Sequence, residues 1–179
     1  MRIALVTSEQ AEPLVDLLCE INAYYNPRSP ASRAETREHA QNNLLSSRSP
    51  HRLVVATLPD GKVVGLAAIT LAYSLVEPEP ERRSHCQLKE LFVSAPYRSL
   101  GTGRALMAWL ARYALERGCH RIDWPVKAAN SRGIAFYRSF AAFQVEDRLS
   151  FRLVEPHLGE LAASAEGGSN DVSQETPRK

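Results

Sequence analysis

Apolar residues recur along the first part of the chain with spacings that predict a strand followed by two helices. The run "RIALVT", residues 2–7, is short and apolar, as in a buried strand. Residues 12–25 carry apolar side chains every three or four positions, the period of one helix face, at Leu14, Leu17, Leu18, Ile21 and Tyr25. After the break "NPRSP", a more polar helix is expected over about residues 32–45.

Two further apolar runs predict a hairpin, and a third strand follows it. Residues 51–58 and 63–73 flank "PDGK", and an Asp-Gly pair between apolar runs is typical of a hairpin turn. A polar connection leads to a strand at 85–93, and it contains Glu77, Glu79 and Glu81. The three glutamates are either an attractive surface for a cationic amine or a solvated loop.

The last part of the pattern alternates helices and strands. A helix is expected over residues 101–118, and Gly118 is typical of a helix C-terminus. A strand, a short helix and a final strand or hairpin follow, at residues 120–126, 130–140 and 141–154. Because a hairpin lies among alternating helices and strands, we predict an α/β (α+β) fold. Its sheet is mixed and flanked by helices, rather than uniformly parallel.

Length and composition indicate one domain. A chain of 179 residues that is 44% hydrophobic and 23% charged can form a single ordinary core. Beyond Pro156 the residues become small and polar, and "AEGGSNDVSQETPRK" has almost no large apolar side chain. Such a segment cannot bury enough apolar surface to fold. We therefore predict a domain over 1–155 and a disordered tail over 156–179.

Charge and cysteine content argue against several kinds of partner. A formal net charge of +2, with no basic run longer than Arg82-Arg83, does not favour nucleic acid. No stretch approaches the roughly 18 apolar residues of a membrane span, and the N-terminus is unlike a signal peptide. The cysteines are odd in number and lack the spacing of a zinc site or disulfide framework, at Cys19, Cys86 and Cys119. We expect a soluble, cytoplasmic protein without a metal, a nucleic-acid partner or a membrane.

The segment "LFVSAPYRSLGTGRAL", residues 91–106, places two glycines at the start of a predicted helix. Each costs about 1 kcal/mol there relative to alanine. One interpretation is a phosphate-binding loop, because amides at a helix N-terminus are unpaired and carry the positive end of the helix dipole. A second interpretation is the Gly-x-Gly-x-x-Gly loop of dinucleotide-binding proteins. However, seven residues separate the strand from the glycines here, and Leu106 stands at the position of the third glycine. An ordinary tight turn is the third.

Three motifs in order bear on this choice. The chain has an Arg-x-x-Gly-x-Gly loop, then a strand, an asparagine and a Phe-Tyr pair on a short helix, at Arg98, Gly101, Gly103, Asn130, Phe136 and Tyr137. This order resembles the acetyl-coenzyme A (acetyl-CoA) binding core of the GNAT superfamily of N-acetyltransferases. The resemblance covers roughly residues 2–153 and is strongest over 88–143. Its details are similar to the branch with diamine and polyamine acetyltransferases, and it implies a mostly antiparallel sheet with splayed middle strands.

The resemblance implies acetyl-CoA as cosubstrate and no metal. Its pyrophosphate is expected on the backbone of the loop, at Arg98, Ser99, Leu100, Gly101, Thr102, Gly103 and Arg104. The strand residues Leu91, Phe92 and Val93 are expected to pair with the pantetheine arm and to offer an amide to the thioester oxygen. Asn130 is expected to hold the pantetheine, to cap the following helix, or both. The chain departs from the family at Ala141, where glycine is usual, so that turn is expected to be less left-handed or mildly strained.

Tyr137 and Glu90 are the candidates for the two proton transfers. The resemblance places Tyr137 at the coenzyme, as general acid for the departing thiolate; a core or rim tyrosine is the alternative. Glu90 is the candidate base, acting through water. In a regular strand it shares a face with Leu88 and Phe92, and apolar neighbours raise the pKa of a carboxyl. The alternatives are a strand glutamate paired with a cation, or His85 as the base.

These expectations predict an acetyl-CoA-dependent N-acetyltransferase that moves an acetyl group to a primary amine by direct attack on the thioester. The acceptor is expected to be a small cationic amine or an amino acid derivative. A protein N-terminus or lysine is the second choice, and Lys89 weakens the case for a multiply charged acceptor. A non-catalytic acyl-CoA-binding sensor is the alternative from another class. The oligomeric state is left open, with a homodimer as one possibility.

Overall fold

A computed structural model describes residues 1–166 of the chain. Two compact units are present, Met1–Lys127 and Ala128–Lys179. The predicted domain 1–155 includes the first unit and part of the second, and its boundary stays a prediction.

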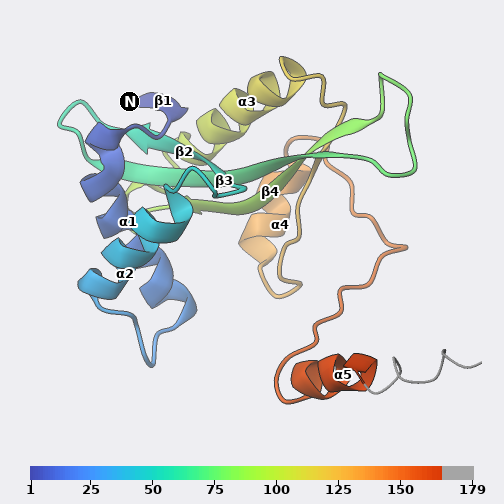
Figure 1. The fold of residues 1–179 in the computed structure, drawn as a ribbon. Coiled ribbons are helices and arrows are strands. Elements are labelled where there is room, and N and C mark those ends of the chain that lie inside the picture. Colours follow the sequence, from blue (N-terminus) through green and yellow to red (C-terminus); the bar gives the residue numbers. More distant parts are fainter. Residues whose placement is uncertain (167–179) are drawn as a thin grey trace, which may run out of the picture. The chain divides into compact units, whose positions relative to one another are not determined.

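The first unit is built on a five-stranded sheet with the order β1-β2-β3-β4-β5 (Figure 1). Its strands are β1 (Arg2–Leu5), β2 (Arg52–Thr57), β3 (Val63–Tyr73), β4 (Ser84–Val93) and β5 (Ile122–Asp123). The first four pair with their neighbours in antiparallel fashion, whereas β4 and β5 are parallel. This confirms the predicted mixed, mostly antiparallel α/β sheet.

Helices of the first unit lie on both faces of this sheet (Figure 1). One face carries α1 (Ala11–Tyr25), with α2 (Arg33–His39) beside it, and the other carries α3 (Thr102–Leu115). Three short turns connect these elements: η1 (Ser8–Gln10), the π-helical η2 (Ala40–Leu44) and η3 (Ala95–Tyr97). The polar helix predicted from residue 32 is therefore split between α2 and η2.

Apolar side chains fill the space between the sheet and its helices. On the α1 side, Leu14 and Leu17 pack in a cluster with residues of β2, β3 and β4, namely Leu53, Val55, Val63, Leu66, Ala68 and Phe92. On the α3 side, a Cβ on Gly65 would lie 3.0 Å from Leu106 Cδ1 and 3.2 Å from Thr102 Cγ2. The absence of a side chain at Gly65 therefore lets the start of α3 pack closely on β3.

Strand β4 pairs with β5 only near its beginning. The paired residues are Cys86 with Ile122 and Gln87 with Asp123. Residues 88–93 keep β3 on one side but have no partner in β5 on the other. Residues 88–93 therefore form a free edge of the sheet, and the splayed middle strands that the family resemblance implied stay a prediction.

A β-bulge in the β3–β4 ladder decides which face each β4 side chain occupies. Ala68 pairs with Glu90, but the adjacent Ile69 pairs with Leu88, so β4 has one extra residue between them. Paired residues point to the same side of a sheet, and neighbours in β3 point to opposite sides. Glu90 therefore shares the α1 face with Phe92 but not with Leu88, and the expectation from a regular strand was wrong for Leu88.

The second unit contains α4 (Ser131–Arg138) and α5 (His157–Glu166). The Asn130 side chain accepts a hydrogen bond from the Gly133 amide at 2.9 Å, so Asn130 caps α4 as expected. Ala141 has a φ of +59°. The turn after α4 is thus left-handed, contrary to one expectation, and alanine bears the mild strain that was the other.

Two segments of this unit differ from the sequence pattern. Residues 143–154 form no strand, although Phe143, Leu149 and Phe151 alternate with polar positions and are exposed. The pattern supplies an apolar face, but a strand also needs a backbone partner, which this segment does not find among the described residues. Helix α5 lies in the segment for which disorder was expected, where "GELAASAE" has good helix formers. Residues 167–179 lie outside the described part.

Candidate active site

The glycine loop joins the free end of β4 to the start of α3. Ser99 and Gly101 adopt positive φ angles of +62° and +85°, and α3 begins directly afterwards. The first intrahelical bond runs from the Ala105 amide to the Gly101 carbonyl at 2.9 Å. The start of α3 precedes this bond, and the first amides of a helix generally lack a carbonyl partner within it. This geometry fits an anionic group such as a pyrophosphate.

Gly101 is required by the conformation of the loop rather than by lack of room. A Cβ built on this residue would meet no atom within 4 Å. A φ of +85°, however, is a region that residues with a side chain rarely adopt. The glycine therefore fixes the direction of the turn, and with it the direction of the first amides of α3.

Arg98 holds the loop against the end of β4. Its Nε donates a hydrogen bond to the Val93 carbonyl at 2.8 Å. Its guanidinium lies 5.3 Å from the ring centroid of Phe92 and 5.8 Å from that of Tyr24. This arginine thus connects the loop, β4 and α1, which orders the backbone that was predicted to bind the coenzyme.

Glu90 lies on the free edge of β4, half-buried against the end of α1. Its carboxylate accepts hydrogen bonds from the Tyr25 hydroxyl at 3.1 Å and from the Leu91 amide. Burial raises the pKa of this carboxyl above its ordinary value, although the Tyr25 and Leu91 bonds and the charge of Lys127 act in the opposite direction. A carboxylate of this kind can take up a proton closer to neutral pH than an exposed one.

The structure places His85, the alternative candidate base, away from Glu90. His85 precedes Glu90 by five residues, or about 16 Å along a strand. Its Nδ1 is buried without a hydrogen-bond partner among the described residues. Burial, followed by the positive charge of Arg121, lowers the pKa of its imidazole. His85 therefore belongs to the β5 end of β4 and not to the free edge that carries Glu90.

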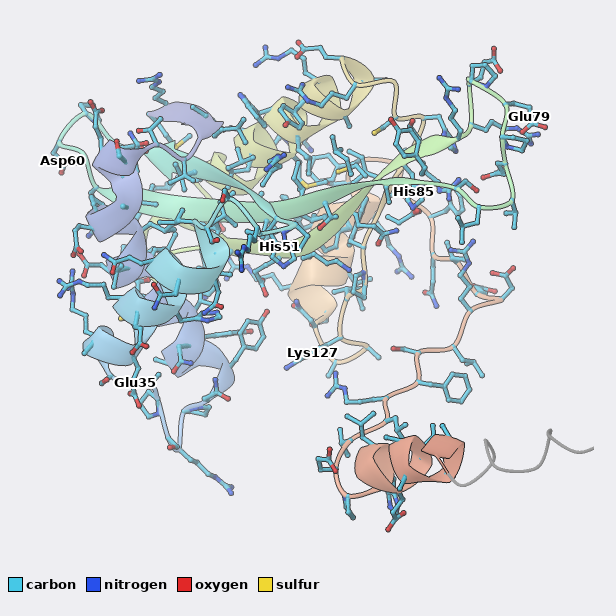
Figure 2. All side chains as sticks on the ribbon, viewed as in Figure 1. Glu35, His51, Asp60, Glu79, His85 and Lys127 are labelled. Carbon is cyan, nitrogen blue, oxygen red and sulfur yellow. The ribbon has the colours of Figure 1, made fainter. Side chains whose placement is uncertain are left out.

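The acidic loop between β3 and β4 also lies away from the free edge that carries Glu90. Glu79 is at the far end of the long β3–β4 hairpin, away from α1 and α2 (Figure 2). Glu77 forms ion pairs with Arg121 at 2.9 Å and with Arg82 at 3.8 Å, and Glu79 pairs with Arg82 at 3.2 Å. These ion pairs favour the solvated-loop interpretation over an amine-attracting surface at the free edge.

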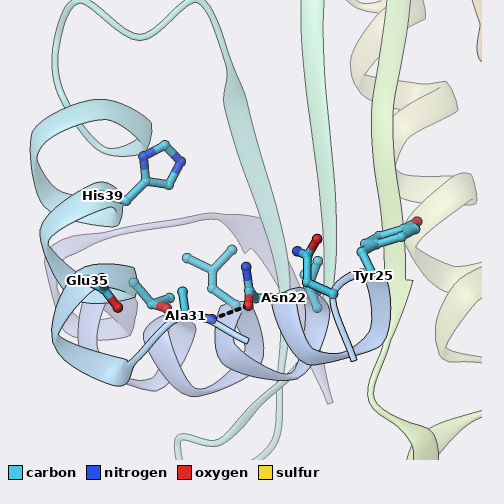
Figure 3. A pocket seen from close by; sticks show the side chains of 9 residues that line it. Asn22, Tyr25, Ala31, Glu35 and His39 are labelled. Atoms are coloured by element: carbon cyan, nitrogen blue, oxygen red, sulfur yellow. Dashed lines mark hydrogen bonds between the residues drawn. The ribbon is translucent and has the colours of Figure 1, made fainter. Parts of the chain in front are cut away.

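A pocket that the sequence did not indicate opens between α1 and α2. Its volume is about 440 Å³. Side chains of both helices line it, among them Asn22 and Tyr25 from α1 and Glu35 and His39 from α2 (Figure 3). The Asn22 side chain accepts a hydrogen bond from the Ala31 amide at 2.7 Å and so anchors the loop between the helices. The one signal that could have pointed to this pocket is the polar Asn22 beside the apolar Leu18 and Ile21 of α1.

Tyr137 and Asn130 belong to the second unit. Tyr137 is half-buried on α4, and its ring centroid lies 5.3 Å from that of Phe136 in an edge-to-face arrangement. Asn130 uses its side chain as the cap of the same helix. The role of either residue at the coenzyme stays a prediction.

Across residues 1–166, no helix combines the length and apolar character needed to cross a bilayer. Within the same range, no three His, Cys, Asp or Glu side chains are grouped to hold a metal ion. All three cysteines are free, and Cys86 and Cys119 are buried. Burial raises the pKa of the Cys86 thiol to about 12, so this cysteine is an unreactive core side chain.

Comparison with known proteins places this geometry in a family. The model of the acetyltransferase (GNAT) family matches residues 15–143, which include the sheet from β2 to β5, the glycine loop and α4. The chain belongs to the GNAT acetyltransferase family. Its enzyme class is therefore that of an N-acetyltransferase, and GNAT enzymes generally use acetyl-CoA.

Individual proteins and solved structures resemble the chain over most of its length. A thialysine N-epsilon-acetyltransferase from Caenorhabditis elegans is 24% identical over 135 residues, which cover 75% of this chain and 78% of the relative. An integron cassette protein from the mobile metagenome of V. cholerae has a similar structure, with a TM-score of 0.82, 27% identity and coverage of 90% and 96%. A ribosomal-protein-alanine N-acetyltransferase from Brucella melitensis shares the fold, with a TM-score of 0.66, 23% identity and coverage of 86% and 99%.

Proposed function

We propose that this GNAT enzyme transfers the acetyl group of acetyl-CoA to a primary amine of a small cationic molecule or an amino acid derivative. The observation that carries the proposal is the half-buried Glu90 carboxylate on the free edge of β4. The strand that carries this edge, β4, continues directly into the glycine loop. A base, an open backbone edge and an anion-binding helix start therefore follow one another along β4 and α3.

Different residues of the first unit bind different parts of acetyl-CoA. The loop backbone from Ser99 to Arg104 binds the pyrophosphate, since helix-start amides favour anions. The free edge at Leu91–Val93 pairs with the pantetheine arm and so orients the thioester, as an added strand does. Orientation of this kind accounts for much of the rate of a two-substrate reaction.

Two proton transfers complete the reaction. Glu90, through a water molecule, accepts the proton that the amine loses as it attacks the thioester carbonyl. Tyr137 donates a proton to the departing thiolate. A coenzyme A thiolate is a good leaving group, so this second transfer contributes less than the first.

The name of the C. elegans relative supports an acceptor whose amine is on a side chain or alkyl arm. The same finding supports the branch with diamine and polyamine acetyltransferases. A protein N-terminus or lysine is the second candidate acceptor. A non-catalytic acyl-CoA sensor would need neither Glu90 nor Tyr137, and the raised pKa of a sequestered Glu90 favours the enzyme.

Release of free thiol from acetyl-CoA in the presence of a panel of amines tests the proposal. Wild type is expected to turn over at least one small primary amine. Tyr137→Phe is expected to lower kcat by about 100-fold or less, because general acids contribute about 10²–10⁴-fold and this leaving group is good. The exposed Tyr73→Phe is the control and should leave kcat unchanged.

Two outcomes would contradict these assignments. Tight coenzyme binding without turnover of any amine would favour the sensor. Equal rates for wild type and Tyr137→Phe would remove Tyr137 from the mechanism while leaving the acetyltransferase activity in place.

A further inference from the structure

The chain offers few amines of its own to an acetyl donor. Of its 22 lysines and arginines, 18 are arginines and only four are lysines, namely Lys62, Lys89, Lys127 and Lys179. An arginine guanidinium stays protonated in proteins, so it does not act as a nucleophile toward a thioester. The amines that can take an acetyl group are therefore these lysines and the N-terminus. The structure describes the first three lysines, and their surroundings differ.

Lys127 lies beside the candidate base. It is exposed, and it follows the end of β5 by four residues, within the first unit. Its Nζ lies 4.9 Å from the ring centroid of Tyr25, whose hydroxyl donates the hydrogen bond to Glu90 at 3.1 Å. The positive charge of Lys127 also acts on the Glu90 carboxyl. The Tyr25 ring is thus in contact with both a potential nucleophile and a potential base.

Lys62 has a similar contact in a different part of the unit. Its Nζ lies 5.4 Å from the ring centroid of Tyr97, and it is exposed in the turn between β2 and β3. Tyr97 directly precedes the glycine loop, where the pyrophosphate is proposed to bind. Asp60, in the same turn as Lys62, lies in a different part of the molecule from Lys127 (Figure 2). Lys62 is therefore near the proposed pyrophosphate site, whereas Lys127 is near Glu90.

We propose that Lys127 is a site of self-acetylation, at which the enzyme moves the acetyl group of bound acetyl-CoA to its own Nζ when no acceptor amine is present. The inference rests on the proposed acetyl transfer at the free edge of β4. The neutral Lys127 amine attacks the thioester carbonyl, so a C–N bond forms and the C–S bond breaks. One amine proton passes through water to Glu90, and the leaving thiolate takes up a proton from solvent to give free coenzyme A.

Acetylation of Lys127 also changes the surroundings of the candidate base. The acetyl-lysine amide is uncharged, so the cation that favours the ionised form of Glu90 is lost. The pKa of the Glu90 carboxyl then rises further, and less of this carboxyl is deprotonated at low pH. Self-acetylation therefore lowers activity at acidic pH in an enzyme that has met acetyl-CoA without an acceptor.

Incubation of the full chain with acetyl-CoA, without any acceptor amine, tests the proposal. Peptide mass spectrometry gives the acetylation rates of Lys62, Lys89 and Lys127. A sample unfolded in urea gives the purely chemical rates, which should be alike for the three lysines. In the folded protein, Lys127 is expected to react at least about ten-fold faster than the other two, because orientation beside a thioester accelerates transfer.

Lys127→Arg keeps the charge but removes the nucleophile, and Lys62→Arg is the matched control because Lys62 also lies on a tyrosine ring. Lys127→Arg should lose the fast acetylation, and Lys62→Arg should retain it. The rate per molecule should not depend on protein concentration, because transfer occurs within one chain. Similar rates at Lys127 and Lys62 in the folded protein, fastest reaction at Lys89, or a rate per molecule that rises with concentration would overturn the inference.

Chemical labelling separates this inference from the proposed function, because labelling needs no turnover. The N-hydroxysuccinimide ester of acetic acid labels exposed lysines, here with coenzyme A, with ADP or with neither. Coenzyme A is expected to lower the labelling of Lys127 several-fold. ADP has a pyrophosphate but no pantetheine arm, so it should leave Lys127 accessible.

Protection of Lys127 by coenzyme A alone supports its position at the thioester even if no amine is turned over. Labelling of Lys127 that coenzyme A does not change would overturn the inference. Turnover of a free amine without fast acetylation of Lys127 would also overturn it, while the proposed function would stand.

Discussion

At the residue scale, the proposed role of Glu90 as a base depends on what surrounds its side chain. A glutamate on a strand is ordinary, and its sequence neighbours do not reveal its environment. Glu90 shares the α1 face with Phe92, and there the last residue of α1, Tyr25, donates a hydrogen bond to it. Burial and this hydrogen bond act on the pKa of Glu90 in opposite directions. Tyr25 therefore counteracts part of the rise in the Glu90 pKa that burial causes, and it would adjust the pH range of the proposed base.

Replacing Tyr25 with Phe is expected to move the acidic limb of the pH profile of kcat/KM to higher pH. The hydroxyl bond favours the ionised form of Glu90, so its loss raises the pKa of that carboxyl further and leaves less of it deprotonated at low pH. The measurement is kcat/KM from pH 5 to 9 with one amine.

Tyr24→Phe is the matched control for this change. Tyr24 precedes Tyr25 on α1, and its ring contacts do not require the hydroxyl. Its profile should coincide with that of wild type. A limb that stays in place in Tyr25→Phe, or that moves equally in both variants, would show that the Tyr25 hydroxyl does not act on the base.

At the element scale, the link between β4 and α3 positions the backbone that we propose binds the coenzyme. Gly65 allows the start of α3 to approach β3, and Arg98 fastens the loop to the last residue of β4. Gly101 then turns the chain into α3 with a positive φ. Glycine is thus needed at these two positions for different physical reasons. Gly65 allows close packing, and Gly101 allows the backbone conformation.

Gly101→Ala is expected to weaken both stability and coenzyme binding, whereas Gly118→Ala should weaken stability alone. Both glycines have a positive φ, +85° and +71°, and a Cβ on either would meet no atom within 4 Å. Each substitution should therefore cost about 1–2 kcal/mol of unfolding free energy. Only Gly101 directs the amides at the start of α3, so only its variant should lose about ten-fold in coenzyme A affinity.

Denaturant unfolding and calorimetry with coenzyme A measure the two effects in the same samples. If both variants lose affinity equally, the loss comes from reduced stability and not from the loop. If neither loses affinity, the coenzyme does not use these amides.

At the scale of the whole molecule, the motifs shared by the family do not specify which parts of the chain bind the acceptor. The family match begins at residue 15, inside α1, and ends at residue 143. The pocket between α1 and α2 is lined by residues that the motif pattern does not include, among them Glu35 and His39. Beyond the match, the described side chains of α5 are exposed, including Leu158 and Leu161.

A chain that ends after residue 155 is expected to keep the stability and coenzyme affinity of the full protein. Exposed side chains contribute little to unfolding free energy, so the change should be below about 0.5 kcal/mol. Thermal unfolding and coenzyme A calorimetry of both chains provide the comparison. A large decrease in unfolding temperature would instead place residues 156–179 within the folded domain.

Sequence patterns alone determined the order of elements from β1 to α4 and the position of the glycine loop, because both depend on local rules. Periods of two and of about 3.6 residues distinguish strands from helices, and an Asp-Gly pair predicts a turn wherever it lies between strands. The Arg98–Gly103 motif is equally local, since its proposed function depends on its own backbone. Residues 141–154 show the limit of such rules, because a strand pattern without a pairing partner is not a strand.

Only the tertiary structure decided how Glu90 differs from any other strand glutamate. The bulge that separates it from Leu88 arises from pairing with β3, a strand about twenty residues earlier in the chain. Tyr25 is 65 residues away in sequence, and the hydrogen bond between them exists because α1 packs on the sheet. The α1–α2 pocket likewise depends on packing between helices, where each helix contributes only part of the lining. Side-chain environments of this kind are properties of contacts between distant segments, which no local spacing records.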